Sequence, residues 1–219
     1  MTDELLEQTL DACPVIAIIR TRDAGNVPAV LRTLVDRGIH AVELPLTTPG
    51  ALEAIRAAAA SGLDGLVLGA GTVLDAPSAR AAVEAGARYL VTPAVLPEVI
   101  DEARLLGVPV LPGALTPTEI LQARSAGATM VKVFPVAAVG GPDYITAVRA
   151  PLPDVLLVPT GGVSVHDAPE YLRAGAYAVA MGSPLIGDAC ESGDMTGLAS
   201  RADELLRGLR GWKRGVRNA

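Results

Sequence analysis

The stretch "RYLVTPAVLPEVIDEARLLGVPVLPG", residues 88–113, contains one complete structural unit and the start of the next. It begins with a short run of strand-forming residues, RYLVTP, and continues as LPEVIDEARLLG, a helical pattern that ends in glycine as many helices do. A second apolar run, VPVLPG, follows directly. This order of strand, helix and strand is typical of parallel strands joined by a right-handed crossover.

The same alternation extends along the chain. Helix candidates such as 49–60, 76–86, 96–107 and 116–127 separate the apolar runs. Eight runs recur about every 20 to 26 residues, at 14–20, 41–46, 65–71, 88–93, 108–113, 129–135, 155–162 and 177–183. We therefore predict that residues 1–219 form a single α/β domain, a (β/α)8 TIM barrel. An open, doubly wound sheet is the alternative, because periodicity does not show closure.

Both ends of the chain carry further helical patterns. The acidic, amphipathic start predicts a helix from Thr2 to Ala12 that covers the bottom of the barrel. The last amphipathic segment, Thr196 to Leu209, predicts a helix on the surface.

Composition and charge limit the function classes. Half of the residues are hydrophobic but only 3% are aromatic, which suits a buried parallel sheet packed with small aliphatic side chains. The net charge is −6 without a basic stripe, so we expect no nucleic-acid partner. Because no stretch resembles a signal peptide or a membrane span, we expect a soluble, cytoplasmic protein without a membrane partner.

Cysteine and histidine are sparse. Cys13 and Cys190 have no motif spacing, so reduced thiols are expected. His40 and His166 lie far apart, which argues against a histidine-rich metal centre. We expect neither a metal nor a cofactor.

The first candidate for chemistry lies in "MVKVFPVAAVGG", residues 130–141. The chain contains 18 Lys and Arg residues, yet only Lys132 and Lys213 are lysines, and Lys213 belongs to a polar tail. Lys132 is flanked by Val131 and Val133, where an ammonium group would be costly to desolvate. A lysine, unlike an arginine, can lose its proton and act as an amine nucleophile. Lys132 is therefore a candidate nucleophile.

Glu43, in AVELPL, is the second ionisable group within an apolar strand. If Lys132 and Glu43 both face the interior, an amine and a carboxylate would meet across the lumen. Such a pair can form a Schiff base with a carbonyl, with the carboxylate moving protons through carbinolamine, imine and enamine. A structural buried ion pair is the alternative interpretation.

The last two strands end in glycine turns, PTGGVS at 159–164 and MGSPL at 181–185. TIM barrels often bind phosphate at this position through backbone N–H groups, and Ser164 or Ser183 adds a hydroxyl. Glycine also serves any tight turn, so the turns alone leave the ligand open.

Other polar residues follow the strands. Arg20 can hold a carboxylate or a phosphate, or make a structural salt bridge. Thr72 and Thr92 can donate hydrogen bonds to a ligand, although threonine is also common at strand ends for its β-propensity. His166 falls at a helix start and receives no catalytic role.

Several blocks together resemble a known family. In order they are PVIAIIR, VELPL, GAGTVLDA, LVTPAV, VPVLPGALTPTEI, VKVFPVAAVGG, PTGGVS and MGSPL. The sequence resembles the 2-keto-3-deoxy-6-phosphogluconate (KDPG) aldolases and the related 2-keto-3-deoxy-6-phosphogalactonate and 4-hydroxy-2-oxoglutarate aldolases, over nearly the whole barrel.

The resemblance implies a metal-free class I aldolase, a lyase that is typically a homotrimer. Such an enzyme cleaves phosphorylated keto-deoxy sugar acids and releases pyruvate. It implies that Lys132 is the Schiff-base lysine and that Glu43 is the general acid and base. The residues implied to bind substrate are Thr72, Pro93 and Phe134 around pyruvate, and Gly161, Gly162 and Ser183 around the phosphate.

Thr47 departs from the gluconate pattern, in which an arginine usually follows the glutamate strand and helps to hold substrate. Sequences of the galactonate type resemble this chain in lacking it. The expected reaction is cleavage of the gluconate compound, slightly favoured, or of its galactonate epimer, to pyruvate and D-glyceraldehyde 3-phosphate. We expect Arg20 to take over part of the anion binding.

Three alternatives stay open at this point. The first is a 4-hydroxy-2-oxoglutarate aldolase, which releases pyruvate and glyoxylate. The second is a phosphate-binding barrel, an isomerase or a transferase, in which Lys132 binds only phosphate. The third is an inert barrel that binds a ligand or assembles with other proteins.

Overall fold

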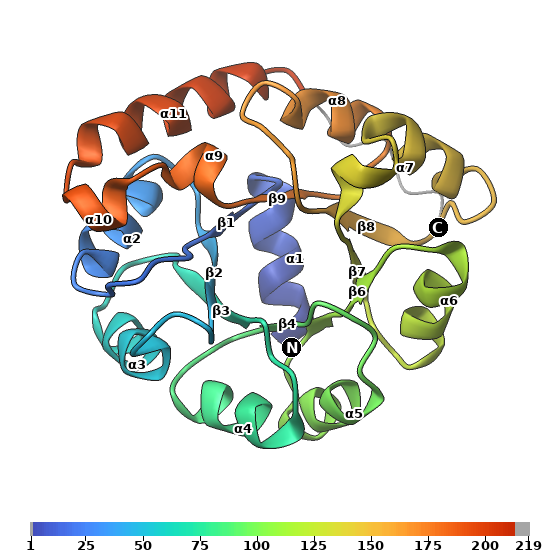
Figure 1. Ribbon diagram of the computed structural model, residues 1–219, viewed down its shortest axis with the longest axis horizontal. Coiled ribbons are helices and arrows are strands. Elements are labelled where there is room, and N and C mark those ends of the chain that lie inside the picture. Colours follow the sequence, from blue (N-terminus) through green and yellow to red (C-terminus); the bar gives the residue numbers. More distant parts are fainter. Residues whose placement is uncertain (1, 213–219) are drawn as a thin grey trace.

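The computed structural model describes residues 2–212 and has the architecture of a closed barrel of parallel strands inside a ring of helices (Figure 1). The predicted polar tail with Lys213 lies outside the described residues. The strands are β1 (Val15–Ile18), β2 (Ala41–Pro45), β3 (Val67–Gly71), β4 (Leu90–Val91), β5 (Val110–Leu111), β6 (Gly113–Ala114), β7 (Met130–Val133), β8 (Leu156–Pro159) and β9 (Val179–Met181).

Two hydrogen-bonded sheets join to close this barrel. One has the order β5-β4-β3-β2-β1-β9 and the other β6-β7-β8. The Thr160–Ala180 bridge connects the residue after β8 to the middle of β9, and only Pro112 separates β5 from β6. Closure confirms the (β/α)8 barrel and excludes the open sheet.

The predicted fifth strand, 108–113, differs in detail, because it is divided into β5 and β6 at Pro112. Proline has no N–H to donate to a neighbouring strand, which accounts for the break. The Pro112 carbonyl still accepts the backbone N–H of Lys132 at 2.9 Å. The backbone hydrogen bonding to β7 therefore continues across the break.

The helices match the predicted segments closely. α5 ends where Gly107 adopts a left-handed conformation, and Thr116 and Glu119 form a capping box at the start of α6. The elements outside the strands are α2 (Val27–Asp36), α3 (Ala51–Ala60), α4 (Ala76–Glu84), α5 (Pro97–Leu106), α6 (Pro117–Ser125), η1 (Val136–Val139), α7 (Pro142–Arg149), α8 (Ala168–Arg173), α9 (Ser183–Ile186), α10 (Ala189–Ser192) and α11 (Met195–Gly208).

Helix α1 (Thr2–Ala12) lies across the barrel axis in Figure 1. Its Leu6 and Leu10 are buried in the same apolar cluster as side chains of the lumen. The hydroxyl of Tyr177 donates a 2.9 Å hydrogen bond to Asp11 and so ties the helix to the barrel. α1 therefore covers the bottom, as predicted.

Strand alternation divides the buried side chains into two cores. One lies between the strands and the outer helices. The other fills the lumen and contains Ile16, Ile18, Ala41, Val67, Tyr89, Val91, Leu111, Met130, Val158, Ala178 and Ala180. Since side chains two residues apart share a face, Glu43 follows Ala41 into the lumen and Lys132 follows Met130.

Packing in the lumen depends on a glycine in β3. A Cβ atom at Gly69 would lie 2.4 Å from the ring of Tyr89, which is fully buried. We expect Gly69→Ala to lower the free energy of unfolding by about 1–3 kcal/mol through overpacking. Urea denaturation measures this change.

Gly197→Ala in α11 is the matched control. There a Cβ atom would lie 3.1 Å from the flexible end of Arg201, and alanine favours a helix by about 1 kcal/mol over glycine. Equal stability of Gly69→Ala and wild type would show that the Tyr89 ring does not fill the space over β3.

Candidate active site

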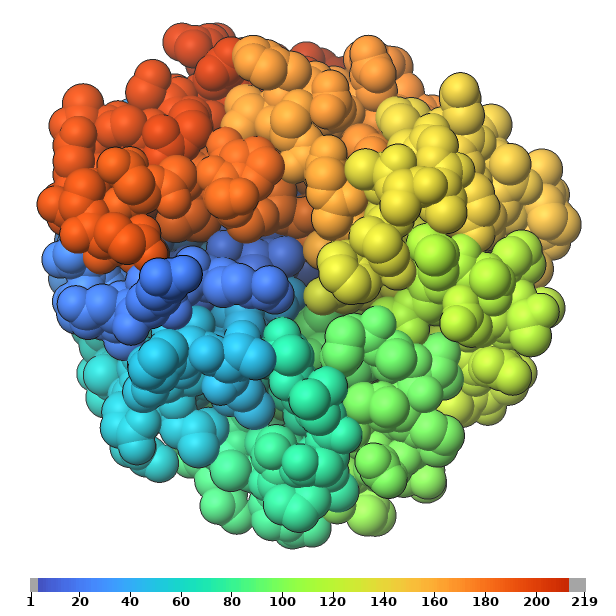
Figure 2. Space-filling view, viewed as in Figure 1, coloured from blue at the N-terminus to red at the C-terminus, as the bar shows by residue number. Residues whose placement is uncertain are grey.

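The polar residues of the lumen gather at the carboxyl ends of the strands. Glu43 in β2 is in register with Ile18 and Gly69, and Lys132 in β7 is in register with Gly113 and Val158. Figure 2 shows a face of the barrel on which segments from most of the chain meet around the centre. The carboxyl ends of the strands are where TIM-barrel enzymes hold their catalytic groups.

The carboxyl group of Glu43 is enclosed by the barrel wall. Only 2% of the residue is exposed, and a Cβ atom at Gly71 would lie 1.9 Å from its Oε1. Gly71 therefore provides the space that this carboxyl group occupies. Burial raises the pKa of Glu43, while the charges of Lys132 and Arg20 act in the opposite direction.

These effects make Glu43 suited to proton transfer. Burial stabilises the protonated acid, and the two cations stabilise the carboxylate. The positive charges of Lys132 and Arg20 are close enough to act on the pKa of Glu43. The structure thus brings together the two ionisable groups that the sequence placed in separate apolar strands.

Lys132 is 8% exposed and lies under an aromatic ring. Its Nζ is 5.2 Å from the ring centroid of Phe134, a cation–π distance when the amine is charged. Phe134 itself is 39% exposed, so the ring separates the amine from solvent on one side. On the neighbouring strand, Gly113 packs closely against the backbone of Pro93.

The glycine turn after β8 packs against the same aromatic residue. Gly161 and Gly162 have φ angles of 86° and 90°, which disfavour other residues. A Cβ atom at Gly161 would lie 2.9 Å from the Phe134 ring, and one at Gly162 would lie 2.3 Å from Cβ of Ala137. The turn is therefore shaped by close packing on the β7 loop.

The second predicted turn, after β9, contains Gly182 and leads to Ser183 at the start of α9. Arg201 of α11 holds this short helix through 2.7 Å hydrogen bonds to the carbonyl groups of Leu185 and Ile186. Because Thr160, just after β8, is bridged to Ala180 of β9, the two glycine turns begin side by side.

The remaining predicted residues fall at the same end of the barrel. Thr72 is half-buried directly after β3, with an unusual φ of 54°. Arg20 is exposed beyond β1, and Thr47 is exposed beyond β2. Thr92 is fully buried, and its hydroxyl donates a 2.6 Å hydrogen bond to the Ala94 carbonyl. The hydroxyl proton is therefore used within the protein.

His166 lies away from this group. It precedes α8 as expected, and its Nδ1 is 3.4 Å from Glu204 of α11. Its role in the structure is a surface contact between two helical segments.

Sequence reasoning gave no role to two buried lumen residues. Thr160 is 4% exposed just after β8, and in the sequence it is one of several threonines that follow apolar strands. Tyr89 is fully buried beside β3. The alternation of Tyr89, Val91 and Pro93 on one strand face is the signal that places this tyrosine inside.

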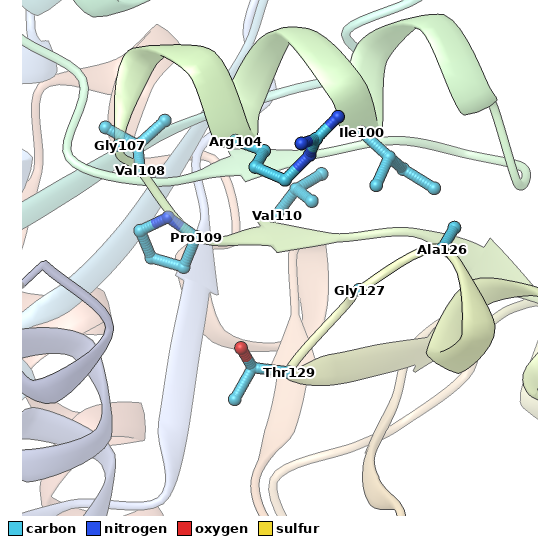
Figure 3. Close-up of a pocket in the computed structure, with 9 residues that line it drawn as sticks. All are labelled: Ile100, Arg104, Gly107, Val108, Pro109, Val110, Ala126, Gly127 and Thr129. Carbon is cyan, nitrogen blue, oxygen red and sulfur yellow. The ribbon is translucent and has the colours of Figure 1, made fainter.

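Two hollows lie at the other end of the barrel. The one in Figure 3, with a volume of about 200 Å³, is lined by α5 and by segments that precede β5 and β7. The second, of about 560 Å³, includes Leu5 of α1 among its lining residues. Both are separate from the carboxyl ends of the strands, where Glu43 and Lys132 lie.

Among residues 2–212, no group of three or more histidine, cysteine or acidic side chains is arranged to hold a metal ion. Within the same part of the chain, no helix has the length and apolar character needed to cross a membrane.

Comparison with known proteins places the chain in a class of barrel enzymes. The family described as "KDPG and KHG aldolase" matches residues 6–199. The chain belongs to this family of aldolases, as the sequence blocks indicated, and it is therefore an aldehyde-lyase.

Three relatives illustrate the likeness. The probable 2-dehydro-3-deoxy-6-phosphogalactonate aldolase of Rhizobium meliloti (strain 1021) is 38% identical over 83% of this chain and 86% of its own length. The solved native KDPGal structure has a TM-score of 0.84 at 33% identity, covering 90% of this chain and 94% of that one. KDPG aldolase from Legionella pneumophila, captured with pyruvate as a covalent carbinolamine, has a TM-score of 0.83 at 27% identity, covering 90% and 95%.

The buried position of Glu43 predicts a pH-dependent effect on stability. Its pKa is raised in the folded state, whereas the pKa of an unfolded glutamate is about 4.3. Stability from the buried neutral acid is thus fully present below that value and is lost as pH rises through the folded pKa. We expect Glu43→Gln to gain stability relative to wild type between pH 4 and pH 8.

Urea denaturation across this pH range measures the difference. Glu53→Gln, at an exposed position of α3, controls for the loss of one negative charge. A relative loss of stability in Glu43→Gln as the pH rises would mean that Lys132 and Arg20 outweigh burial.

Proposed function

We propose that this chain is a Schiff-base aldolase that cleaves a 2-keto-3-deoxy-6-phospho sugar acid to pyruvate and D-glyceraldehyde 3-phosphate. The observation that carries the proposal is the placement of Lys132 beside Glu43 in an otherwise largely apolar lumen. An amine nucleophile and a proton-transfer group are the two parts that this chemistry requires. The carbinolamine captured in the Legionella pneumophila relative supports the same chemistry here.

The proposed reaction begins at the Nζ of neutral Lys132, which attacks the C2 carbonyl of the substrate. The carbinolamine loses water to give an iminium ion, with Glu43 supplying and accepting protons. Glu43 then removes the C4 hydroxyl proton, the C3–C4 bond breaks, and its electrons move into the iminium to form an enamine. The aldehyde leaves, C3 is protonated by Glu43, and hydrolysis releases pyruvate and the free amine.

Binding roles follow from the arrangement around these groups. We assign Thr72, Pro93 and Phe134 to the pyruvate end, since Phe134 covers Lys132 and Pro93 packs on its neighbouring strand. The phosphate end would lie at Gly161, Gly162 and Ser183, whose turns begin on bridged strands. Arg20, whose charge acts on Glu43, is placed to attract an anionic substrate.

The segment after β2 bears on which sugar epimer is the substrate. An exposed Thr47 stands where gluconate-type sequences usually have arginine, and the Rhizobium meliloti relative is named for the galactonate compound. These two points favour the galactonate epimer as the first substrate to assay. The homotrimer expected from the family resemblance, and the cytoplasmic location expected from the sequence, belong to the same proposal.

Reductive trapping tests the proposed nucleophile. Borohydride added in the presence of pyruvate should reduce the imine and attach a three-carbon acid to Lys132, as seen by peptide mapping. Lys132→Arg should be folded but inactive, because guanidinium keeps the charge without a usable nucleophile. Labelling at Lys213 instead, or substantial turnover by Lys132→Arg, would contradict the Schiff-base mechanism.

Substrate comparison tests the proposed phosphate end. Charge-assisted hydrogen bonds are each worth about 1.5–3 kcal/mol, so several of them should raise kcat/KM for the 6-phosphorylated acid by powers of ten over the free acid. Assays should include both epimers and 4-hydroxy-2-oxoglutarate.

Variants of the exposed Ser183 separate charge from shape. Ser183→Asp should repel the phosphate dianion and largely spare the free acid, whereas Ser183→Asn, of nearly the same size, should do so much less. Equal rates with phosphorylated and free substrates in the wild type would refute the phosphate site and favour 4-hydroxy-2-oxoglutarate as the substrate.

A further inference from the structure

Tyr89 is a buried residue whose polar group has no evident structural use. The residue is fully buried, and among the described residues its hydroxyl has no hydrogen-bond partner. Leaving a buried hydroxyl unpaired is unfavourable, so such groups are normally satisfied by protein or by ordered water. Packing alone would be served equally well by phenylalanine.

The other lumen tyrosine shows the contrast. Tyr177 also has a buried ring, but its hydroxyl donates to Asp11 at 2.9 Å and lies 3.3 Å from the Glu7 carbonyl. Its hydroxyl therefore has a structural role at the bottom of the barrel. Within residues 2–212, Tyr89 has no equivalent contact.

Tyr89 and Glu43 occupy adjacent spaces along β3. The Tyr89 ring lies against Gly69, and the Glu43 carboxyl group lies against Gly71, two residues further along the same strand face. Tyr89 precedes β4 and Glu43 belongs to β2, so the two side chains enter from opposite sides of β3. Both extend into the lumen over these two glycines.

Electrostatics agrees with this geometry. Burial raises the pKa of Tyr89 well above its usual value, and the negative charge of Glu43 raises it further. Tyr89 is therefore a neutral phenol, which can donate a hydrogen bond. The charged groups that act on Glu43 are Lys132 from β7 and Arg20 after β1, and the charge of Glu43 in turn acts on this phenol.

We propose that Tyr89 is a positioning residue for Glu43, acting through one buried water molecule. The phenol donates a hydrogen bond to the water, and the water donates one to the carboxylate. This bridge would keep the carboxylate aimed at the reacting atoms while it accepts and returns protons. The inference rests on the proposed role of Glu43 as general acid and base.

Tyr89→Phe removes the hydroxyl and keeps the ring over Gly69. A hydrogen bond that favours the carboxylate lowers its pKa, so its loss should move the acidic limb of the pH profile toward higher pH. Exchange of the pyruvate methyl protons in D2O, followed by NMR against pH, should also slow by about tenfold or more. Any fall in melting temperature should be small, because among the described residues the hydroxyl has no direct protein partner and only the water-mediated contact is lost.

Tyr177→Phe is the matched control. It removes the hydrogen bond to Asp11 and should lower the melting temperature while leaving the exchange rate and its pH profile unchanged. A wild-type rate and pH profile in Tyr89→Phe would overturn the positioning role.

A double-mutant cycle tests the bridge without turnover. Unfolding midpoints at pH 8 for Tyr89→Phe, Glu43→Gln and the double variant should be non-additive, because the two groups share one bridge. Additive effects would overturn the inference even if the enzyme is active. Failure of the proposed function is a different result, in which the wild type neither exchanges pyruvate protons nor is trapped on Lys132.

Discussion

The electrostatic interaction between Lys132 and Glu43 is the constraint on which the site depends. Each group alone would be costly in a lumen of aliphatic side chains, and the positive charge of Lys132 offsets part of the cost of burying the Glu43 carboxylate. The pair needs room that a regular wall of branched residues would not provide. Gly71 supplies this room for the carboxyl group, so placing Glu43 of β2 in the lumen requires a glycine in β3.

Much of the architecture could be predicted because it depends on local patterns. The eight apolar runs correspond to the strands of a closed barrel, and alternation about Met130 and Ala41 places Lys132 and Glu43 in the same lumen. The division of the fifth strand was not foreseen, because VPVLPG reads as one continuous apolar run. Only the strand pairing shows that Pro112 interrupts the ladder.

The burial and conformation of individual site residues were harder to predict from the sequence. Tyr89 in RYLVTP has the residue type expected of any strand, and its burial depends on Gly69 in a different strand. Such a contact between distant positions cannot be read from one sequence. Thr72 likewise gives no local sign of its positive φ, a conformation usually adopted by glycine.

The separation of the two cores has a consequence for altering the protein. Residues between the strands and the outer helices, such as Leu31 and Ile55, contact a different set of neighbours from those in the lumen. The two sets lie on opposite faces of the same strands, so the backbone is their main mechanical link. The outer layer can therefore serve as the place to engineer heat resistance, while the inner layer is left for redesigning substrate preference.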